Sequence, residues 1–286
     1  MRVCEKVAEI RSVVRELRRS GPVAFVPTMG FFHEGHLTLM REARRRFPSV
    51  VVSIFVNPLQ FGPAEDFAAY PRDLERDLRL ARETGVDAVF APARTEMYPE
   101  RPCTFVDVER LTGVLCGRTR PGHFRGVATV VSKLFNIVQP DAAFFGQKDA
   151  QQLQVIRRLV EDLNFGLEIV AVPTVREADG LAMSSRNMYL SPGERRAATV
   201  LYRSLQVARE AILGGERDLS AVREGLAAQI AAEPLAQLEY AEILALPDLT
   251  PPHATDKELL LAVAARFGRA RLIDNVTVTI GEKTET

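Results

Sequence analysis

The sequence has few cysteines, no long apolar run and no excess of charge of either sign. Its three cysteines, Cys4, Cys103 and Cys116, form no metal-binding or disulfide pattern, so we interpret them as small packing residues in a reducing compartment. The N-terminus has no signal-peptide core, and no apolar stretch approaches the roughly 20 residues that a helix needs to span a membrane. These absences predict a cytoplasmic protein without a membrane partner.

The charged residues are balanced, since Lys plus Arg and Asp plus Glu each contribute 37 of the 286 residues. A chain without a basic excess is not expected to bind nucleic acid, and we interpret the arginines between positions 41 and 46 as a solvated helix face. Two common phosphate-binding sequences are also missing. The chain has no Gly-x-x-x-x-Gly-Lys-Ser/Thr run, which excludes an ordinary P-loop, and no Gly-x-Gly-x-x-Gly follows its first predicted strand.

Apolar runs alternate with helical patterns through the first half of the chain, and 47% hydrophobic residues are ample for a core. The predicted strands are Val23–Pro27, Val50–Val56, Asp87–Ala91, Asp141–Phe145 and Leu167–Val172. The predicted helices are Glu5–Arg19, Gly35–Phe47, Pro71–Thr84, Arg125–Val138 and Asp149–Leu163. This order predicts an α/β fold with a Rossmann-like parallel sheet, helices on both faces and ligands at the carboxyl ends of the strands.

The pattern changes after about Val175. Long helices are expected over Ser191–Leu213 and Leu219–Ala232, followed by strands over Leu238–Leu246 and Glu258–Phe267. We therefore expect two domains, a Rossmann-like catalytic domain over residues 1–175 and a smaller α+β lid domain over residues 176–286.

Two histidines lie where the first predicted strand turns into a helix, in the run Pro27-Thr28-Met29-Gly30-Phe31-Phe32-His33-Glu34-Gly35-His36. The first N–H groups of a helix lack internal partners and lie at the positive end of its dipole, so they favour a phosphate, to which imidazoles can also donate. The alternative is a plain strand-to-helix turn with solvated histidines. A zincin site is excluded, because it needs His-Glu-x-x-His with its histidines four residues apart.

Two polar sequences have open interpretations, one directly after a predicted strand and one at the start of a predicted helix. In Asn57-Pro58-Leu59-Gln60-Phe61-Gly62, the amides of Asn57 and Gln60 suit a hydroxyl or carboxylate ligand, or Asn57 caps a turn. Gly122-His123-Phe124-Arg125-Gly126 is either a second anion-binding helix start or a loop bounded by glycines.

Two further sequences carry groups suited to phosphate. In Gly146-Gln147-Lys148-Asp149-Ala150-Gln151-Gln152, Lys148 would supply a point charge and Asp149 a helix cap or a ligand to ribose or Mg²⁺; the alternative is a capped helix with an exposed lysine. Asp179-Gly180-Leu181-Ala182-Met183-Ser184-Ser185-Arg186-Asn187 is either a triphosphate clamp or a Ser-rich linker.

Taken together, these sequences closely resemble the pantothenate synthetase (pantoate–β-alanine ligase) family, from Pro27 to about Tyr189 and more weakly beyond. The shared motifs are Pro-Thr-Met-Gly-x-x-His-Glu-Gly-His, Phe-Val-Asn-Pro-x-Gln-Phe, Gly-His-Phe-Arg-Gly-Val, Gly-x-Lys-Asp-x-Gln-Gln and Asp-Gly-Leu-Ala-x-Ser-Ser-Arg-Asn, in the family's order. The family belongs to the His-x-Gly-His nucleotidyltransferases. Phe31-Phe32 and Ala150 depart from its usual residues, and the two phenylalanines would affect affinity rather than reaction type.

The resemblance implies a two-step reaction. The carboxylate of pantoate attacks the α-phosphorus of Mg–ATP to give pantoyl adenylate and pyrophosphate, and the amine of β-alanine then displaces AMP. It also implies a homodimer, catalytic roles for His33, His36 and Lys148, and pantoate binding by Gln60 and Gln152. The implied ATP-binding residues are Met29, Gly30, Phe31, Phe32, His33, Glu34, Gly35, His36, Gly146, Gln147, Lys148, Asp149, Val175 (through its main chain), Met183, Ser184, Ser185 and Arg186.

Two other functions would share part of this pattern. A cytidylyltransferase or an amino-acid-activating enzyme has the histidine motif, but should not need Gln60 and Gln152 to hold a small hydroxy acid. A non-catalytic nucleotide-binding module would tolerate loss of Lys148 or His36, both of which are present. The ligase is therefore the prediction.

Overall fold

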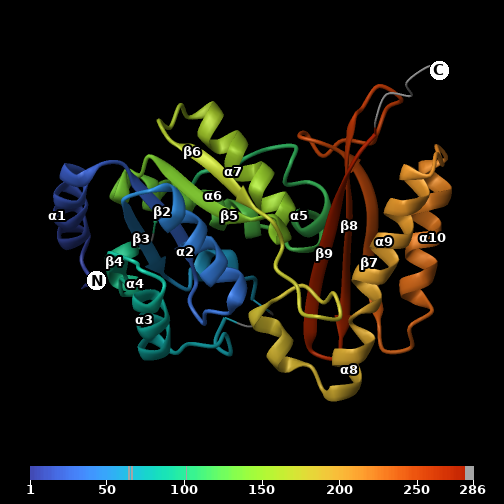
Figure 1. Cartoon of the computed structure of the whole chain (residues 1–286), viewed down its shortest axis with the longest axis horizontal. Helices are drawn as coiled ribbons and strands as arrows, with labels where there is room; N and C mark the ends of the chain where they lie inside the picture. Colours follow the sequence, from blue (N-terminus) through green and yellow to red (C-terminus); the bar gives the residue numbers. More distant parts are fainter. Residues whose placement is uncertain (64, 66, 101, 281–286) are drawn as a thin grey trace. The chain divides into compact units, whose positions relative to one another are not determined.

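The structure is a computed structural model that describes residues 1–63, 65, 67–100 and 102–280 (Figure 1). By its internal contacts the chain divides into two compact units. Unit 1 comprises Met1–Gly113, Arg120–Gln147 and Gln152–Thr174. Unit 2 comprises Val114–Thr119, Lys148–Gln151 and the chain from Val175 onward.

Unit 1 is built on a six-stranded sheet in the order β1-β4-β3-β2-β5-β6, whose neighbouring strands are parallel. Its strands are β1 (Arg2–Cys4), β2 (Val23–Thr28), β3 (Ser49–Ile54), β4 (Ala88–Phe90), β5 (Ala142–Gly146) and β6 (Glu168–Val172). The central strands β2 and β3 are mainly apolar and buried over most of their length, as expected for a parallel sheet covered on both faces. The predicted Rossmann-like sheet is confirmed.

Helices connect these strands. They are α1 (Val7–Leu17), α2 (Glu34–Arg46), α3 (Leu74–Glu83), α4 (Arg94–Met97), α6 (His123–Val138) and α7 (Ala150–Asp162), with 3-10 turns η1 (Arg18–Ser20), η2 (Pro58–Gln60) and η3 (Gln147–Asp149). Leu39, Met40 and Ala43 of α2 pack with Val26 and Val52 of the sheet in one apolar cluster. Their spacing is that of a helix which buries one stripe.

The strand order fixes where a ligand can bind. From β2 the chain continues outward through β3 and β4, whereas β5 and β6 add on the opposite side of β2. The order therefore reverses between β2 and β5. In open parallel sheets, ligands bind at such a reversal, outside the carboxyl ends of the strands.

Unit 2 contains an antiparallel sheet of β7 (Gln237–Ala245), β8 (Glu258–Phe267) and β9 (Ala270–Thr279), in that order. Its helical segments are α5 (Leu115–Thr119), η4 (Ser185–Tyr189), α8 (Pro192–Ala197), α9 (Val200–Leu213) and α10 (Leu219–Ala231). Leu259, Leu261 and Val263 alternate along β8 and pack with Leu201 and Leu205 of α9. The predicted α+β character of the C-terminal region is confirmed.

One predicted helix was wrong, and strand β9 was missed. The single helix expected over 191–213 is interrupted after α8, where Ala198 and Thr199 have φ and ψ near −60° and −20°. These angles stay in the right-handed helical region, so the spacing of apolar residues changes little across the break and does not reveal it. Strand β9 was not predicted, because the buried polar pair Asp274 and Asn275 interrupts its alternation of apolar residues.

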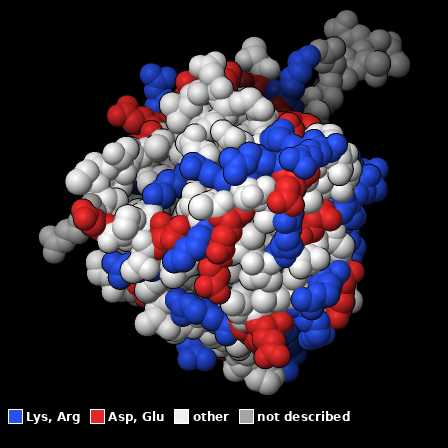
Figure 2. All heavy atoms as spheres, turned by 90° about the vertical axis from the view of Figure 1, so that its left-hand side faces the viewer, with Lys and Arg blue, Asp and Glu red and all other residues white. Residues whose placement is uncertain are grey.

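The surface carries both signs of charge. Figure 2 shows Lys and Arg interspersed with Asp and Glu on the face it presents. The arginines of α2 form ion pairs, in which Arg41 contacts Glu34 and Arg44 contacts Asp87 at 2.9 Å. Among the described residues, no helix is long and apolar enough to cross a membrane.

Candidate active site

The chain turns sharply after β2, and we call Met29–His36 the histidine turn. Gly30 has φ 85°, and a Cβ there would lie 2.9 Å from Oδ2 of Asp77. Asp77, from α3, accepts hydrogen bonds from the main-chain N–H groups of Phe31 at 2.6 Å and Phe32 at 2.7 Å. Its side chain is 1% exposed, and burial raises the pKa of this carboxyl despite both hydrogen bonds. A buried carboxylate from a distant helix thus fixes the turn.

The two imidazoles form the start of α2. His33 is the N-cap, and its Nδ1 accepts a hydrogen bond from the N–H of Gly35 at 3.1 Å. Nδ1 of His36 accepts one from the N–H of His33 at 3.3 Å, and the ring centroids are 4.1 Å apart. A main-chain N–H can only donate, so each ring uses Nδ1 as an acceptor and carries its proton on Nε2. Both rings are therefore built as Nε2–H donors.

The structure changes the explanation of how this turn could hold a phosphate. The N–H groups of Phe31, Phe32, His33 and Gly35 are bonded within unit 1, and that of Gly30 donates to Oγ1 of Thr28 at 3.2 Å. The expectation that unpartnered N–H groups bind the anion therefore does not hold for these groups. Since Nδ1 accepts in both rings, the donor group of each imidazole is its Nε2–H.

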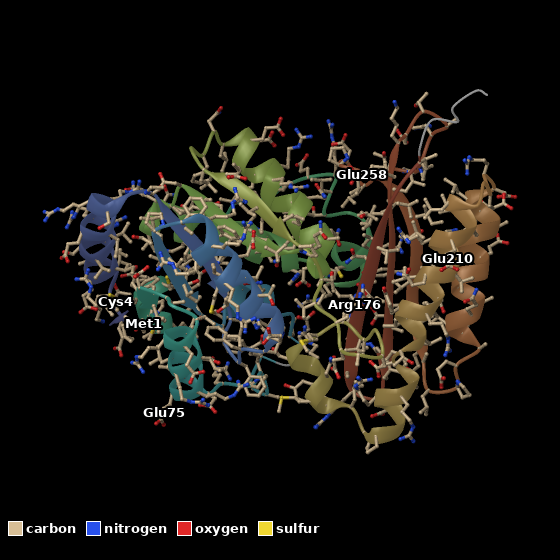
Figure 3. The ribbon with its side chains drawn as sticks, in the orientation of Figure 1. Met1, Cys4, Glu75, Arg176, Glu210 and Glu258 are labelled. Carbon is tan, nitrogen blue, oxygen red and sulfur yellow. The ribbon has the colours of Figure 1, made fainter. Side chains whose placement is uncertain are left out.

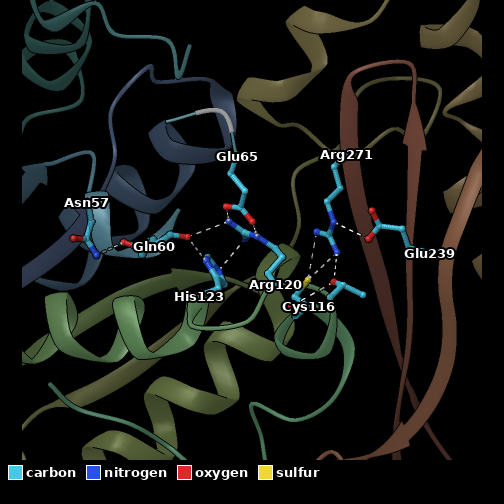
Figure 4. Close-up of polar contacts among 9 residues, drawn as sticks. Asn57, Gln60, Glu65, Cys116, Arg120, His123, Glu239 and Arg271 are labelled. Carbon is cyan, nitrogen blue, oxygen red and sulfur yellow. Dashed lines mark hydrogen bonds and ion pairs between the residues drawn. The ribbon is translucent and has the colours of Figure 1, made fainter. Parts of the chain in front are cut away.

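A second polar network follows β3 (Figure 4). Asn57 is fully buried, and its Nδ2 donates to Oε1 of Gln60 at 3.0 Å and to the carbonyl of Gly126 at 3.0 Å. Its Oδ1 accepts from the N–H of Leu59 and from the hydroxyl of Tyr98. Asn57 caps η2 and orients Gln60, so of the two interpretations of Asn57 the turn cap is confirmed, and the interpretation as a ligand amide is not.

The main chain of Gln60 is held by His123, the first residue of α6, and by Arg120, which precedes this helix. Nδ1 of His123 donates to the Gln60 carbonyl at 2.8 Å, and Arg120 donates to the same oxygen at 3.3 Å. Arg120 also forms a bidentate ion pair with Glu65 at 2.6 and 2.7 Å. Burial acts to raise the pKa of Glu65, but the hydrogen bonds and the positive charge of Arg120, together with smaller contributions from Gly62 and His123, keep this pKa below its usual value. Gln60 is thus fixed through its main chain and its side chain.

The strand order reverses between β2 and β5, so the residues after β5 lie across this reversal from the histidine turn, which follows β2. Gly146 ends β5, and a Cβ built on it would have no heavy atom within 4 Å. Lys148 follows in η3, with Nζ 3.7 Å from Oδ1 of Asp149, and its carbonyl accepts a hydrogen bond from Asn275 at 2.8 Å. Gln152 is half-buried in the first turn of α7.

The segment Val175–Asn187, which we call the serine loop, belongs to unit 2. The N–H of Met183 donates to the carbonyl of Val175 at 3.0 Å, and Ser184 caps η4 by accepting from the N–H of Arg186. Arg195 of α8 binds Asp179 at 2.7 Å and Glu177 at 2.6 Å.

Arg176, labelled in Figure 3, ties the base of the serine loop to β9. It pairs with both carboxylate oxygens of Asp274 at 2.6 and 2.8 Å and lies 3.8 Å from the ring centroid of Tyr202. Asp274 is almost fully buried, and burial raises the pKa of its carboxyl despite the ion pair with Arg176. The loop therefore has a buried anchor at its base and exposed ion pairs beyond it.

The candidate residues are divided between the two units. Unit 1 holds the histidine turn, Gln60, Gly146, Gln147 and Gln152, and the loops after β2, β3 and β5 leave the same edge of the sheet. Unit 2 holds Lys148, Asp149, Val175 and Met183–Arg186.

Three contributors escaped the sequence interpretation. Asp77 fell inside a predicted helix without being singled out, and Tyr98 and Arg120 were not singled out either. The signal for Asp77 was weak, because only its full burial distinguishes it from the neighbouring acidic residues of α3.

The sequence matches the family model described as pantoate-beta-alanine ligase over residues 2–277. The pantothenate synthetase of Pelotomaculum thermopropionicum is 62% identical over 276 residues, which cover 96% of this chain and 98% of that protein. The pantothenate synthetase of Heliobacterium modesticaldum is 60% identical over 281 residues, 98% of this chain and 100% of that protein.

Solved structures agree with these relatives. The crystal structure of pantothenate synthetase from Thermus thermophilus superposes with a TM-score of 0.92 at 52% identity, covering 96% of this chain and 99% of that chain. The pantoate-beta-alanine ligase of Francisella tularensis, solved in complex with β,γ-ATP and β-alanine, gives a TM-score of 0.78 at 31% identity, covering 96% and 97%. The chain belongs to the pantoate–β-alanine ligase family.

Proposed function

We propose that this enzyme joins (R)-pantoate to β-alanine in an ATP-dependent reaction that passes through pantoyl adenylate and releases pyrophosphate and AMP. The observation that carries the proposal is the histidine turn, which leaves β2 at the strand-order reversal with its imidazoles set as Nε2–H donors. The ATP and β-alanine bound by the Francisella relative support the same substrates here.

The first step needs alignment and charge stabilisation more than a covalent group. The carboxylate of pantoate is already a nucleophile at neutral pH, so the enzyme has to place it in line with the α-phosphorus and stabilise charge on the departing phosphates. His36 and His33 would donate from Nε2 to phosphate oxygens. Lys148 would supply a positive charge to the same leaving group.

The remaining candidate residues would bind substrate. Gln60 and Gln152 would hold the hydroxyls and carboxylate of pantoate. The proposed ATP ligands are Met29–His36, Gly146–Asp149, the main chain of Val175, and Met183–Arg186. The side chain of Phe32 is fully buried in the core of unit 1, so its contribution to ATP binding would come from its main chain.

The serine loop would close over the triphosphate and exclude water from the acyl adenylate. In this proposal residues 1–175 form the catalytic domain and residues 176–286 the lid. Glu177, Asp179 and Arg195 would set the resting conformation of the loop.

Magnesium fits as part of the Mg–ATP substrate. Among the described residues, no group of three or more His, Cys, Asp or Glu side chains could hold a metal ion alone. Mg²⁺ commonly binds through substrate phosphates and one or two carboxylates, and Asp149, beside Lys148, is a suitable carboxylate. We also propose that the enzyme is a cytoplasmic homodimer, which light scattering on purified protein would test.

The experiment follows both half-reactions. Mixing protein with Mg–ATP and pantoate should release pyrophosphate in an amount near the enzyme concentration, and AMP should appear only after β-alanine is added. Release of ADP and inorganic phosphate would contradict the adenylate mechanism.

A further inference from the structure

The amide of Asn57 has no hydrogen-bonding capacity left for a substrate. Its two N–H bonds go to Gln60 and Gly126, and its oxygen accepts from Leu59 at 3.3 Å and Tyr98 at 3.1 Å. An amide has two donors and one oxygen with two acceptor positions, so all four are used. Asn57 is also fully buried.

Main-chain partners fix which way this amide faces. The carbonyl of Gly126 can only accept and the N–H of Leu59 can only donate, so Nδ2 of Asn57 must face Gly126 and Oδ1 must face Leu59. The close approach needs glycine, because a Cβ on Gly126 would lie 2.1 Å from the carbonyl oxygen of Leu59. The second N–H of Asn57 then demands an acceptor, which is Oε1 of Gln60.

We propose that Tyr98 and Asn57 are positioning residues that fix the side-chain amide of Gln60 with its oxygen toward Asn57, so that Gln60 binds the acid substrate as a hydrogen-bond donor through its NH₂ group. This inference rests on the proposed function. A carboxylate oxygen only accepts hydrogen bonds, so a fixed NH₂ complements it, whereas an amide free to rotate would present its oxygen part of the time.

Tyr98 is suited to this role. Oδ1 of Asn57 is an acceptor, so the Tyr98 hydroxyl must be the donor. The side chain is buried, which raises the pKa of its phenol to about 12 and keeps the hydroxyl protonated at neutral pH. The ring of Phe55 at 6.1 Å between centroids, and Nζ of Lys133 at 5.1 Å from the ring centroid, hold the phenol in place.

The test measures steady-state kinetics of wild type, Tyr98→Phe, Gln60→Ala and the double variant. Loss of one hydrogen bond in Tyr98→Phe should raise the KM for pantoate about three- to tenfold and leave the KM for ATP unchanged. In the Gln60→Ala background, Tyr98→Phe should have no further effect on the KM for pantoate. Such non-additivity is expected when one residue acts through the other, and a general loss of packing would not produce it.

Tyr240→Phe is the matched control, because it removes another buried phenol hydroxyl, which lies 3.2 Å from Sγ of Cys116 in unit 2. It should leave the KM for pantoate unchanged. Additive effects of Tyr98→Phe and Gln60→Ala, or an unchanged KM in Tyr98→Phe, would overturn the positioning role while the ligase activity stands. An inactive wild type would overturn the proposed function, and the inference with it.

Discussion

The histidine turn and the serine loop are held in place by different physical means. Asp77, 1% exposed, fixes the histidine turn through two main-chain hydrogen bonds. The serine loop is held beyond its base by Arg195, whose partner Asp179 has a side chain that is 47% exposed. Exposed ion pairs contribute about 0 to 1 kcal/mol and are screened by salt, whereas buried hydrogen bonds are not replaced by water. We therefore expect the turn to be preorganised and the serine loop to move more easily.

The largest expected effect comes from removing one charge-stabilising group from each unit. His36→Ala and Lys148→Ala should each slow adenylate formation by about 10²–10³, the usual loss for one donor to developing charge. The attack of β-alanine on supplied pantoyl adenylate should be far less affected, because pyrophosphate has already left.

Single-turnover assays of each half-reaction would measure this difference. His253→Ala, which removes an exposed imidazole, is the control and should change neither rate. Equal slowing of both half-reactions would show that His36 and Lys148 act on the α-phosphate or on folding.

The next largest effect is expected for Asp77→Asn, which tests how rigidly the histidine turn is held. Asp77→Asn keeps the shape of the side chain but turns an NH₂ group toward one of two main-chain N–H donors, so the free energy of unfolding should fall by about 1–3 kcal/mol. Urea unfolding of both proteins would measure the loss. Asp179→Asn, the matched change in the serine loop, should cost less, and a larger loss there would reverse the comparison.

A smaller effect concerns the ion pairs of the serine loop. Arg195→Gln should lower the free energy of unfolding by less than about 1 kcal/mol at low salt. In 1 M NaCl, where the Debye length is about 3 Å, wild type and variant should have the same free energy of unfolding. Arg176→Gln is the control. Its partner Asp274 is almost inaccessible to solvent, so the stability difference between wild type and Arg176→Gln should persist at high salt. A loss in Arg195→Gln that persists at high salt would mean that this end of the loop is also rigid.

The smallest expected effect is on the pH dependence of stability, which should have opposite signs for Asp77 and Asp179. Burial raises the pKa of Asp77, so the stability advantage of wild type over Asp77→Asn should grow as pH falls through that raised pKa. The hydrogen bond from Arg195 lowers the pKa of Asp179, so its contribution is present above the unfolded value of about 3.9 and is lost as pH falls through the lowered pKa. Thermal unfolding of both Asn variants between neutral and acid pH would show opposite trends, and parallel trends would contradict the assignment.

The sequence predicted the central sheet well, because buried parallel strands are continuous apolar runs bounded by turns. It failed where polar residues are buried or elements are very short. Strand β9 has Asp274 and Asn275 at buried positions, and β1 has only three residues.

The candidate site was predicted as a set of motifs, but the contacts that organise it were not. Asp77 lies 46 residues from Phe31 along the chain, and Tyr98 lies 41 residues from Asn57. Local sequence carries no signal for such pairs. The same reason explains part of the failed expectation for the histidine turn, since the N–H groups of Phe31 and Phe32 donate to Asp77 of a distant helix. The N–H groups of His33 and Gly35 donate instead to the neighbouring imidazoles.

Unit 2 is not a contiguous stretch of chain, and this affects how the protein must be made. Sγ of Cys116 in α5 accepts hydrogen bonds from Arg271, a partner synthesised 155 residues later (Figure 4). Asn275 likewise reaches back to the carbonyl of Lys148 across 127 residues. During translation, α5 and the turn at Lys148 leave the ribosome long before β9 exists. A polypeptide that begins at Val175 would lack both partners, so a gene divided there would not encode a self-sufficient second half.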